Sequence, residues 1–358
     1  MTDGTFATSR RQSHDKPVTE GIFRGRRVHF VLFWGIMTAT AKRSGRLFIG
    51  SSALPFVPVS PSLFSSAMTD SALFDVVLSG HLTAQERANV FSRLDAAQTF
   101  EQPHRLRLCG VGAGQITEAL KADLSALTQA DAAVVPAGLS LKDFACAFFD
   151  MDSTLVANEC IDELADLYGI KEQVAAITER SMRGELDFEH SLRERVALLK
   201  GAPASIIEEA AARLTPTPGA KETLALLHRC GVKTYITSGG FTQFARRVAA
   251  DYGMAGVVCN NLVIENGVLT GEVTGPAGGA ILDRSGKRRA MEVIAQVSGA
   301  SLAQCIAGGD GANDLDLIGA AGFGFAYRAK PVVAQAARQR VRCGTFAVVA
   351  DWFIDSWG

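Results

Sequence analysis

Two aspartates stand two positions apart at the end of an apolar run in the segment FACAFFDMDSTLVANECID, residues 144–162. Side chains two apart on an extended segment point the same way, so Asp150 and Asp152 are expected to share one crevice. Two close carboxylates cannot both stay ionised without help, and a divalent cation supplies that help. Because a D-x-D pair also occurs in turns and calcium loops, the pair indicates metal-assisted chemistry only if the rest of the chain supplies partners.

Three further segments supply candidates for such partners. The run VKTYITSGGF (232–241) ends in hydroxyls and glycine N–H groups that suit phosphate oxygens. A lysine at the start of a predicted helix in GKRRAMEVIAQV adds a fixed cation, and CIAGGDGANDLDLI (305–318) adds an acid cluster after another predicted strand. Each segment alone is explained equally well as a helix cap, a surface charge or a turn, but together they predict one phosphate site. The candidate residues are Ser238, Gly239, Lys287, Asp310, Asn313 and Asp314.

The elements around these residues predict an α/β fold. The run ACAFF before Asp150 does not alternate, which is typical of a central parallel strand covered by helices on both faces. Open α/β sheets bind ligands at the carboxyl ends of their strands, where Asp150 is expected to lie. Residues 156–215 are rich in helix formers with apolar residues at helical spacing, and TPTPG (215–219) ends them. The sequence therefore predicts a parallel sheet interrupted by a helical insertion.

Composition limits the class of protein. The chain has 358 residues, of which 47% are hydrophobic and 20% charged, so it can bury a sizeable core in about two domains. Lys plus Arg number 36 and Asp plus Glu 37, which gives no electrostatic reason to expect nucleic acid or a membrane as partner. The seven cysteines are scattered without a C-x-x-C pair, which fits a reducing compartment such as the cytoplasm and argues against structural zinc.

The segments DMDST, TSGGF, the lysine at 287 and GDGANDL resemble the four ordered motifs of the haloacid dehalogenase superfamily of phosphatases. Within it, DMDSTLVANECIDELA and LDFEHSLRERVALLKG are similar to the phosphoserine phosphatase family. The resemblance runs from about Phe144 to Lys330. It implies a Rossmann-like core at 141–358 with a parallel sheet and a helical cap inserted after the first motif, at about 156–215.

Residue chemistry and this resemblance imply the same mechanism. Asp150 is the expected nucleophile, because an ionised carboxylate needs no activating base and forms an aspartyl-phosphate that water can open. Mg²⁺ is the expected cofactor, held by the carboxylates of Asp150 and Asp310 and by the main-chain carbonyl of Asp152. The Asp152 side chain is expected to act as general acid and then as general base.

The remaining motif residues are expected to bind the phosphoryl group. Lys287, Ser238 and the Gly239 N–H would hold its oxygens and stabilise charge in the transition state. Asn313 is expected to orient the substrate, and Asp314 to support the metal or Lys287 from behind.

The cap is expected to choose the substrate. O-phosphoserine carries an ammonium and a carboxylate, so its pocket needs an anion and preferably an arginine. By resemblance, Glu159 receives the amino group and Arg195 the carboxylate, with Met182 and Phe188 lining the pocket. The expected reaction is Mg²⁺-dependent hydrolysis of O-phospho-L-serine in serine biosynthesis.

Alternatives remain open at this point. Arg195 could instead pair with an acid of its own helix, Glu189 or Glu194. The chain could be a related phosphatase or phosphotransferase acting on another phosphorylated amino acid, such as phosphohomoserine. It could also be a non-catalytic regulatory or binding module, although the intact Asp150 and Asp152 pair argues against that.

Two N-terminal regions precede the main domain. Residues 1–67 are interpreted as a disordered extension or a mis-assigned start before Met68, and this is favoured over a targeting segment; their apolar run is too short to span a membrane. Residues 70–140 alternate predicted strands and helices, which indicates a small α+β domain, with an ACT-like module as one interpretation. A packing role is favoured for this domain over a regulatory or dimerising role. A homodimer is still possible. Arg328 in AYRAKP departs from the resemblance, which implies a smaller or less basic residue at this position.

Overall fold

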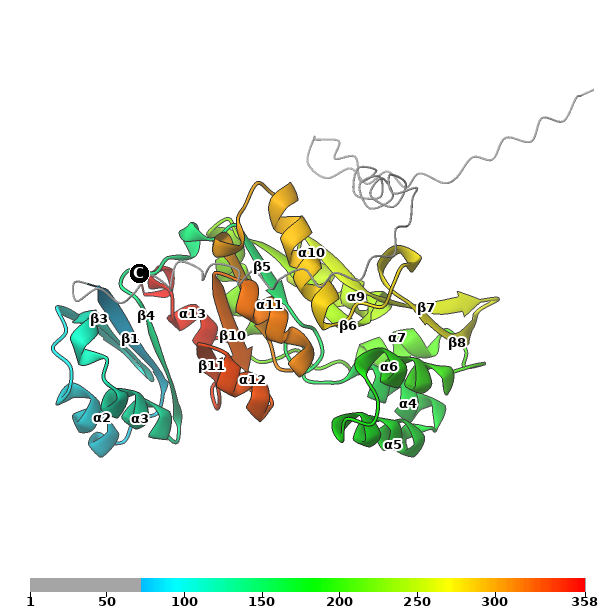
Figure 1. The fold of residues 1–358 in the computed structure, drawn as a ribbon, viewed down its shortest axis with the longest axis horizontal. Coiled ribbons are helices and arrows are strands. Elements are labelled where there is room, and N and C mark those ends of the chain that lie inside the picture. The colour runs from blue at the N-terminus through cyan, green and yellow to red at the C-terminus, as the bar shows by residue number, and fades with distance from the viewer. Residues whose placement is uncertain (1–71, 358) are drawn as a thin grey trace, which may run out of the picture. The chain divides into compact units, whose positions relative to one another are not determined.

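A computed structural model of the protein describes residues 72–357 (Figure 1). The predictions for residues 1–67 lie outside the described residues. Among the helices of 72–357, none is both long enough and apolar enough to cross a membrane. All seven cysteines fall in this part of the chain, and they are free.

The main domain is built on a seven-stranded sheet with the order β11-β10-β9-β5-β6-β7-β8. Every neighbouring pair is parallel except β7 and β8, which form an antiparallel hairpin. Strand β5 lies in the middle, as the run ACAFF predicted, and the α/β fold class is confirmed. The strands are β5 (Cys146–Phe149), β6 (Lys233–Phe241), β7 (Gly256–Glu265), β8 (Val268–Thr274), β9 (Cys305–Gly309), β10 (Phe323–Tyr327) and β11 (Gln339–Val341).

Helices cover both faces of this sheet, and for that reason β5 shows no polar alternation. Cys146 and Phe148 pack in one apolar cluster with residues of α10 and α11, whereas Ala147 and Phe149 pack in another with residues of α8 and α9. These helices are α8 (Ala220–Arg229), α9 (Thr242–Tyr252), α10 (Arg284–Val297), α11 (Leu315–Ala320), α12 (Pro331–Ala336) and α13 (Val348–Asp351). Short 3-10 helices lie at Ala113–Gln115, Leu141–Asp143, Pro276–Gly278, Leu302–Gln304, Ala312–Asp314 and Ile354–Ser356.

A helical cap is inserted between β5 and β6. It consists of α4 (Cys160–Tyr168), α5 (Lys171–Met182), α6 (Phe188–Ala197) and α7 (Ile206–Arg213). The chain enters and leaves it through two paired segments, since Ala157 N donates to Thr215 O at 2.9 Å and Thr217 N to Leu155 O at 3.0 Å. The sequence did not predict that the β7–β8 hairpin packs against the cap helix α6 (Figure 1).

The small N-terminal domain has a four-stranded antiparallel sheet with the order β2-β3-β1-β4, a ferredoxin-like arrangement. Its strand β2 was not predicted, because QTFEQ is an almost wholly exposed edge strand with a single large apolar residue. Its elements are β1 (Leu73–Gly80), α2 (Ala84–Phe91), β2 (Gln98–Gln102), β3 (Arg105–Gly112), α3 (Glu118–Ala126) and β4 (Ala130–Pro136).

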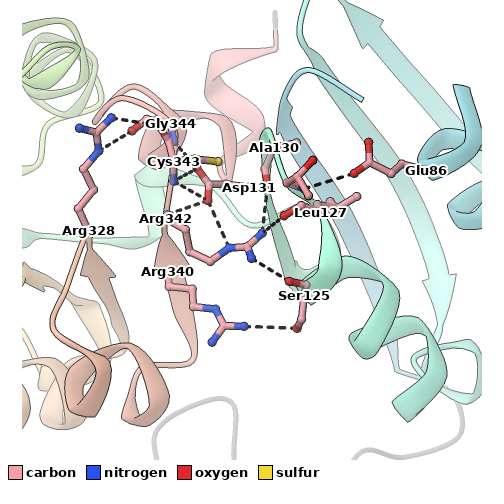
Figure 2. A network of polar contacts seen from close by, with 11 residues as sticks. Glu86, Ser125, Leu127, Ala130, Asp131, Arg328, Arg340, Arg342, Cys343 and Gly344 are labelled. Carbon is pink, nitrogen blue, oxygen red and sulfur yellow. Dashed lines mark hydrogen bonds and ion pairs between the residues drawn. The ribbon is translucent and has the colours of Figure 1, made fainter. Parts of the chain in front are cut away.

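A polar network joins this domain to the loop that follows β11 (Figure 2). The buried carboxylate of Asp131 accepts hydrogen bonds from Arg342 N and Gly344 N, both at 2.7 Å. The Arg342 guanidinium donates in return to the carbonyl oxygens of Ser125 at 2.8 Å and Leu127 at 3.0 Å. The two domains therefore satisfy each other's backbone groups.

Arg328 belongs to the same network (Figure 2). Its backbone has φ 42°, a left-handed conformation, and its side chain donates to Gly344 O at 3.2 Å and Cys343 O at 3.0 Å. Two residues later, Lys330 N donates to Asp310 O at 3.1 Å. Arg328 thus ties the loop after β10 to residues 343 and 344, and the same loop holds the backbone of Asp310.

A buried ion pair lies where the small domain meets residues 351–357. Arg107 is fully buried and contacts Asp75 at 2.7 Å, and it donates to Trp352 O at 3.2 Å. The Ser79 hydroxyl donates to an Asp351 carboxylate oxygen at 2.8 Å. Removing one partner of such a pair would leave an uncompensated buried charge. Contact between the small domain and residues 351–352 therefore depends on all of these groups being present.

Candidate active site

The site lies at the carboxyl end of β5, where Asp150 follows the buried strand. Its backbone N–H donates to Gly308 O of β9 at 3.0 Å, which ties the ends of these two neighbouring strands together. One carboxylate oxygen accepts from Met151 N at 2.8 Å, and the other accepts from Lys287 Nζ at 2.7 Å. Asp150 is buried yet hydrogen bonded at both oxygens, which fixes the orientation of its carboxylate.

Lys287 in the second turn of α10 links two acids. Its fully buried ammonium contacts Asp150 and Asp314, both at 2.7 Å. Burial lowers the pKa of Lys287, but the charges of Asp150 and Asp314 outweigh this and raise it, so the ammonium stays charged. Burial and the charge of Asp150 raise the pKa of Asp314 to about 8, against the opposing effect of Lys287. Gly311 N also donates to Asp314 at 3.1 Å, which holds this carboxylate under the lysine.

Three carboxylates form a cluster that could hold a metal ion. One oxygen from each of Asp150, Asp310 and Asp314 lies within 4.8 Å of the others. Burial, and then the charges of Asp150 and Glu159, raise the pKa of Asp310 to about 7. Such a set of hard oxygen donors suits Mg²⁺, Ca²⁺ or Mn²⁺, and a divalent cation would offset the repulsion between them. The donor set of the chain therefore fits a divalent metal.

Thr154 supports this cluster and was not singled out in the sequence. Its buried hydroxyl donates to Asp310 Oδ1 at 3.2 Å. The residue belongs to the DMDST segment, so its closeness to the two aspartates was the available signal. Its neighbour Ser153 has φ 55°, a sharp turn that brings the chain back over the site.

The side chain of Asp152 lies outside the three-carboxylate cluster. Its Oδ1 accepts from the Cys160 thiol at 2.9 Å, and a Cβ placed on Gly240 would lie 2.9 Å from Oδ2. Burial first, and then the charges of Glu159 and Asp150, raise the pKa of Asp152 well above its usual range. A carboxyl whose pKa is raised in this way is suited to general acid chemistry.

The loop at the end of β6 can receive a phosphate. The Ser238 hydroxyl is buried and accepts from Gly240 N at 3.1 Å. A Cβ on Gly239 would lie only 2.6 Å from the ring of Phe188, the first residue of cap helix α6. Glycine is needed at 239 because the cap touches the loop there.

Asn260 on β7 positions this loop and was missed by the sequence analysis. Its fully buried amide donates to Gly239 O at 2.8 Å and accepts from Leu282 N at 2.7 Å. Because Leu282 directly precedes the N-cap of α10, one amide joins the phosphate loop to the helix that carries Lys287. The available signal was a pair of asparagines in the otherwise apolar run VVCNNLV.

Arg195 does not pair with the acids of its own helix. Glu189 contacts Arg193 at 2.7 Å, and Glu194 contacts Arg180 at 2.9 Å. Arg195 donates only its Nε hydrogen within the helix, to a backbone carbonyl at 3.2 Å. The structure therefore speaks against the alternative in which Arg195 has only a helix-pairing role.

Glu159, the N-cap residue of α4, and Arg195 of α6 are close enough for their charges to interact. Burial lowers the pKa of Arg195, and the charges of Glu159, Asp162 and Asp152 oppose that shift. Glu159 is partly accessible to solvent and accepts from the Ser153 hydroxyl at 2.9 Å; desolvation by its neighbours, and then the charges of Asp150 and Asp162, raise its pKa. A negative and a positive group of the cap thus act on each other electrostatically near Asp152.

Two other predicted site residues, Met182 and Asn313, are exposed or partly exposed. Met182 ends α5 and is 74% exposed, so it does not line a closed pocket in this structure. Asn313 lies in the 3-10 helix after β9, one residue before Asp314, and is partly exposed. Their roles stay predictions.

Comparisons with known proteins agree with this geometry. The family model of the haloacid dehalogenase-like hydrolases matches residues 147–318. A phosphoserine phosphatase of Streptomyces coelicolor is 40% identical over 277 residues, which are 74% of this chain and 67% of that protein. A phosphoserine phosphatase of Albidiferax ferrireducens is 44% identical over 211 residues, or 58% of this chain and 88% of the relative. The crystal structure of a probable phosphoserine phosphatase from Vibrio cholerae superposes with a TM-score of 0.68 at 33% identity, covering 80% of this chain and 88% of that one.

Proposed function

The chain belongs to the phosphoserine phosphatase family of haloacid dehalogenase-like hydrolases and is a phosphatase, and we propose that it hydrolyses O-phospho-L-serine to L-serine and phosphate. The observation that carries the proposal is the arrangement of Asp150. Its carboxylate is held by Lys287 at 2.7 Å, is one of three that could hold a metal ion, and lies near a second carboxyl, that of Asp152, with a raised pKa. A nucleophile, a fixed cation and a proton carrier are the groups that phosphoryl transfer through an aspartate needs.

In the proposed reaction, Asp150 attacks phosphorus while the bond from phosphorus to the serine oxygen breaks. Asp152 gives its proton to that departing oxygen, and then takes a proton from the water that opens the aspartyl-phosphate. Lys287, Ser238 and the Gly239 N–H hold the phosphoryl oxygens and stabilise charge in the transition state.

The proposed cofactor is Mg²⁺. Oxygens of Asp150 and Asp310, with the main-chain carbonyl of Asp152, would hold it, and it would supply positive charge beside the incoming phosphate. Asp314 contacts Lys287 directly, so its proposed role is to hold that lysine in place.

The cap residues support an amino-acid substrate. Glu159 is proposed to receive the ammonium and Arg195 the carboxylate, because these two cap residues carry opposite charges that interact with each other. Phe188 supplies an apolar wall against Gly239, and Met182 and Asn313 are proposed to complete the contacts to substrate. The proposed setting is serine biosynthesis in the reducing cytoplasm, consistent with seven free cysteines, and a homodimer stays part of the proposal.

Phosphate release across a panel of phosphorylated small molecules tests this function. With Mg²⁺, O-phospho-L-serine should give the highest kcat/KM, above phosphohomoserine and phosphothreonine, and chelator should abolish release. Asp150→Asn should abolish both turnover and the phosphoenzyme that can be trapped with labelled substrate. A preference for a substrate without an amino-acid head group would overturn the substrate, and full activity of Asp150→Asn would overturn the mechanism.

A further inference from the structure

The first residue of the cap helix α4 touches the proposed proton carrier. Cys160 is fully buried, and its Sγ lies 2.9 Å from Asp152 Oδ1. We propose that Cys160 is a positioning residue for the reaction, whose thiol hydrogen bond orients the Asp152 carboxyl for proton transfer. The proposal rests on the role assigned above to Asp152 and adds a residue to it.

The thiol is the donor in this contact. A thiol is a weak donor and a carboxylate an acceptor, so an S–H directed at Oδ1 satisfies both groups. The thiol itself is fully buried, so its hydrogen is directed to a protein acceptor rather than to solvent.

The contact gives the two carboxylate oxygens of Asp152 different surroundings. Oδ1 is engaged by the thiol, whereas Oδ2 faces the backbone of the phosphate loop, as shown by the 2.9 Å to a Cβ built on Gly240. The proton of the carboxyl is therefore directed to Oδ2, the oxygen on the side where the phosphoryl group is received. Without the thiol, rotation about the Cβ–Cγ bond would let either oxygen take that position.

The same turn also serves the substrate. Cys160 directly follows Glu159, the proposed acceptor of the substrate ammonium, and α4 packs on α5 and α7. One short stretch at the start of the cap thus presents a substrate contact and supports the proton carrier. This links the position of α4 to the orientation of Asp152.

The test compares substitutions that keep or remove the donor. Cys160→Val removes it with little change of volume, Cys160→Ala removes it with a smaller side chain, and Cys160→Ser keeps a hydroxyl donor. With phosphoserine, whose alkoxide must be protonated as it leaves, Val and Ala should lower kcat by about tenfold or more, a fraction of the usual general acid contribution. Ser should recover kcat to within about threefold of the wild type, and KM should change little in all three.

A second substrate, p-nitrophenyl phosphate, distinguishes a positioning role of Cys160 from a purely structural one. p-Nitrophenolate leaves without a proton, so the pre-steady-state burst of p-nitrophenol, which reports phosphoenzyme formation, should stay within about twofold of wild type in every variant. The matched control is Cys146→Val, because Cys146 is a fully buried cysteine that packs among apolar residues of β5, α10 and α11. It should affect both substrates alike, if at all.

The outcomes separate this inference from the proposed substrate. Loss of the phosphoserine rate in Val and Ala, with rescue by Ser and an unchanged burst, supports the positioning role. Wild-type phosphoserine rates in Val or Ala, or a p-nitrophenol burst that falls as much as the phosphoserine rate, overturn it; Ala decides if Val does not fold. If the wild type prefers another alkyl phosphate, the substrate proposal fails, and the same comparison is made with that alkyl phosphate.

Discussion

The affinity for Mg²⁺ should fall as the pH is lowered through 7. In the metal-free protein, burial and the charges of Asp150 and Glu159 raise the pKa of Asp310 to about 7. A carboxylate must lose its proton to bind a metal, so Mg²⁺ competes with that proton. Below the pKa of Asp310, each unit of pH should therefore weaken apparent binding by about tenfold for one proton released.

The magnitude follows from a single titration. With one carboxyl whose pKa is about 7, the ionised fraction falls about tenfold between pH 8 and pH 6, and the apparent Kd should rise by about the same factor. The stability of the metal-free protein should change in the opposite direction. Because the pKa of Asp310 is raised above the unfolded value of about 4, its contribution to stability is complete below about pH 4 and is lost as the pH rises through about 7.

Isothermal titration calorimetry at pH 6, 7 and 8, in buffers with different ionisation enthalpies, measures both the Kd and the number of protons released. Thermal unfolding with chelator and with Mg²⁺ should show a Tm difference that grows from pH 5 to pH 8. The control is Asp310→Asn, which should bind Mg²⁺ weakly and lose this pH dependence. An affinity that varies less than twofold between pH 6 and pH 8, with no proton release, would contradict a pKa of Asp310 near 7.

Three substitutions test other parts of the site and fold. Arg195→Ala should lose on the order of 2 to 5 kcal/mol of transition-state stabilisation, measured from kcat/KM, with phosphoserine and far less with p-nitrophenyl phosphate. Equal losses with the two substrates would mean that Arg195 has a structural role only. Asn260→Ala leaves Gly239 O and Leu282 N without their partner, so urea unfolding should show a loss of about 1 to 3 kcal/mol for each group, together with reduced kcat. Asp131→Ala should lower the free energy of unfolding by about 1 to 3 kcal/mol, since it strips the acceptor from backbone N–H groups after β11; an unchanged urea midpoint would contradict this.

The motif residues could be found from the sequence because their signal is local. An apolar run that ends in acids, or in hydroxyls and glycines, marks the carboxyl end of a buried strand, and parallel strands bring these ends to one edge. The structure accordingly brings Asp150, Lys287, Asp310 and Asp314 together. The same reasoning identified the cap as a helical insertion.

The supporting residues could not be found in this way, because their function depends on contacts that spacing does not encode. Asn260 is recognisable only once β6 and the loop before α10 lie beside it, and Cys160 only once the turn at Ser153 has folded back over Asp152. Strand β2 carries too few apolar residues to show a period, and its pairing with β3 defines it. Met182 was assigned by resemblance, and its high exposure shows that resemblance does not fix a side chain's surroundings.

The contacts between the small domain and residues 351–357 have a consequence for how the protein is made on the ribosome. Ser79 and Asp351 are 272 positions apart, so at 5 to 20 residues per second the small domain waits roughly 10 to 60 s for its partner segment. During that time the ion pair between Arg107 and Asp75 can form, but the carbonyls of Asp351 and Trp352 that Arg107 also needs have not been synthesised. The nascent small domain thus exposes a charged face whose hydrogen bonds are incomplete until residues 351 and 352 are made, and shortening the chain before residue 351 would make that exposure permanent.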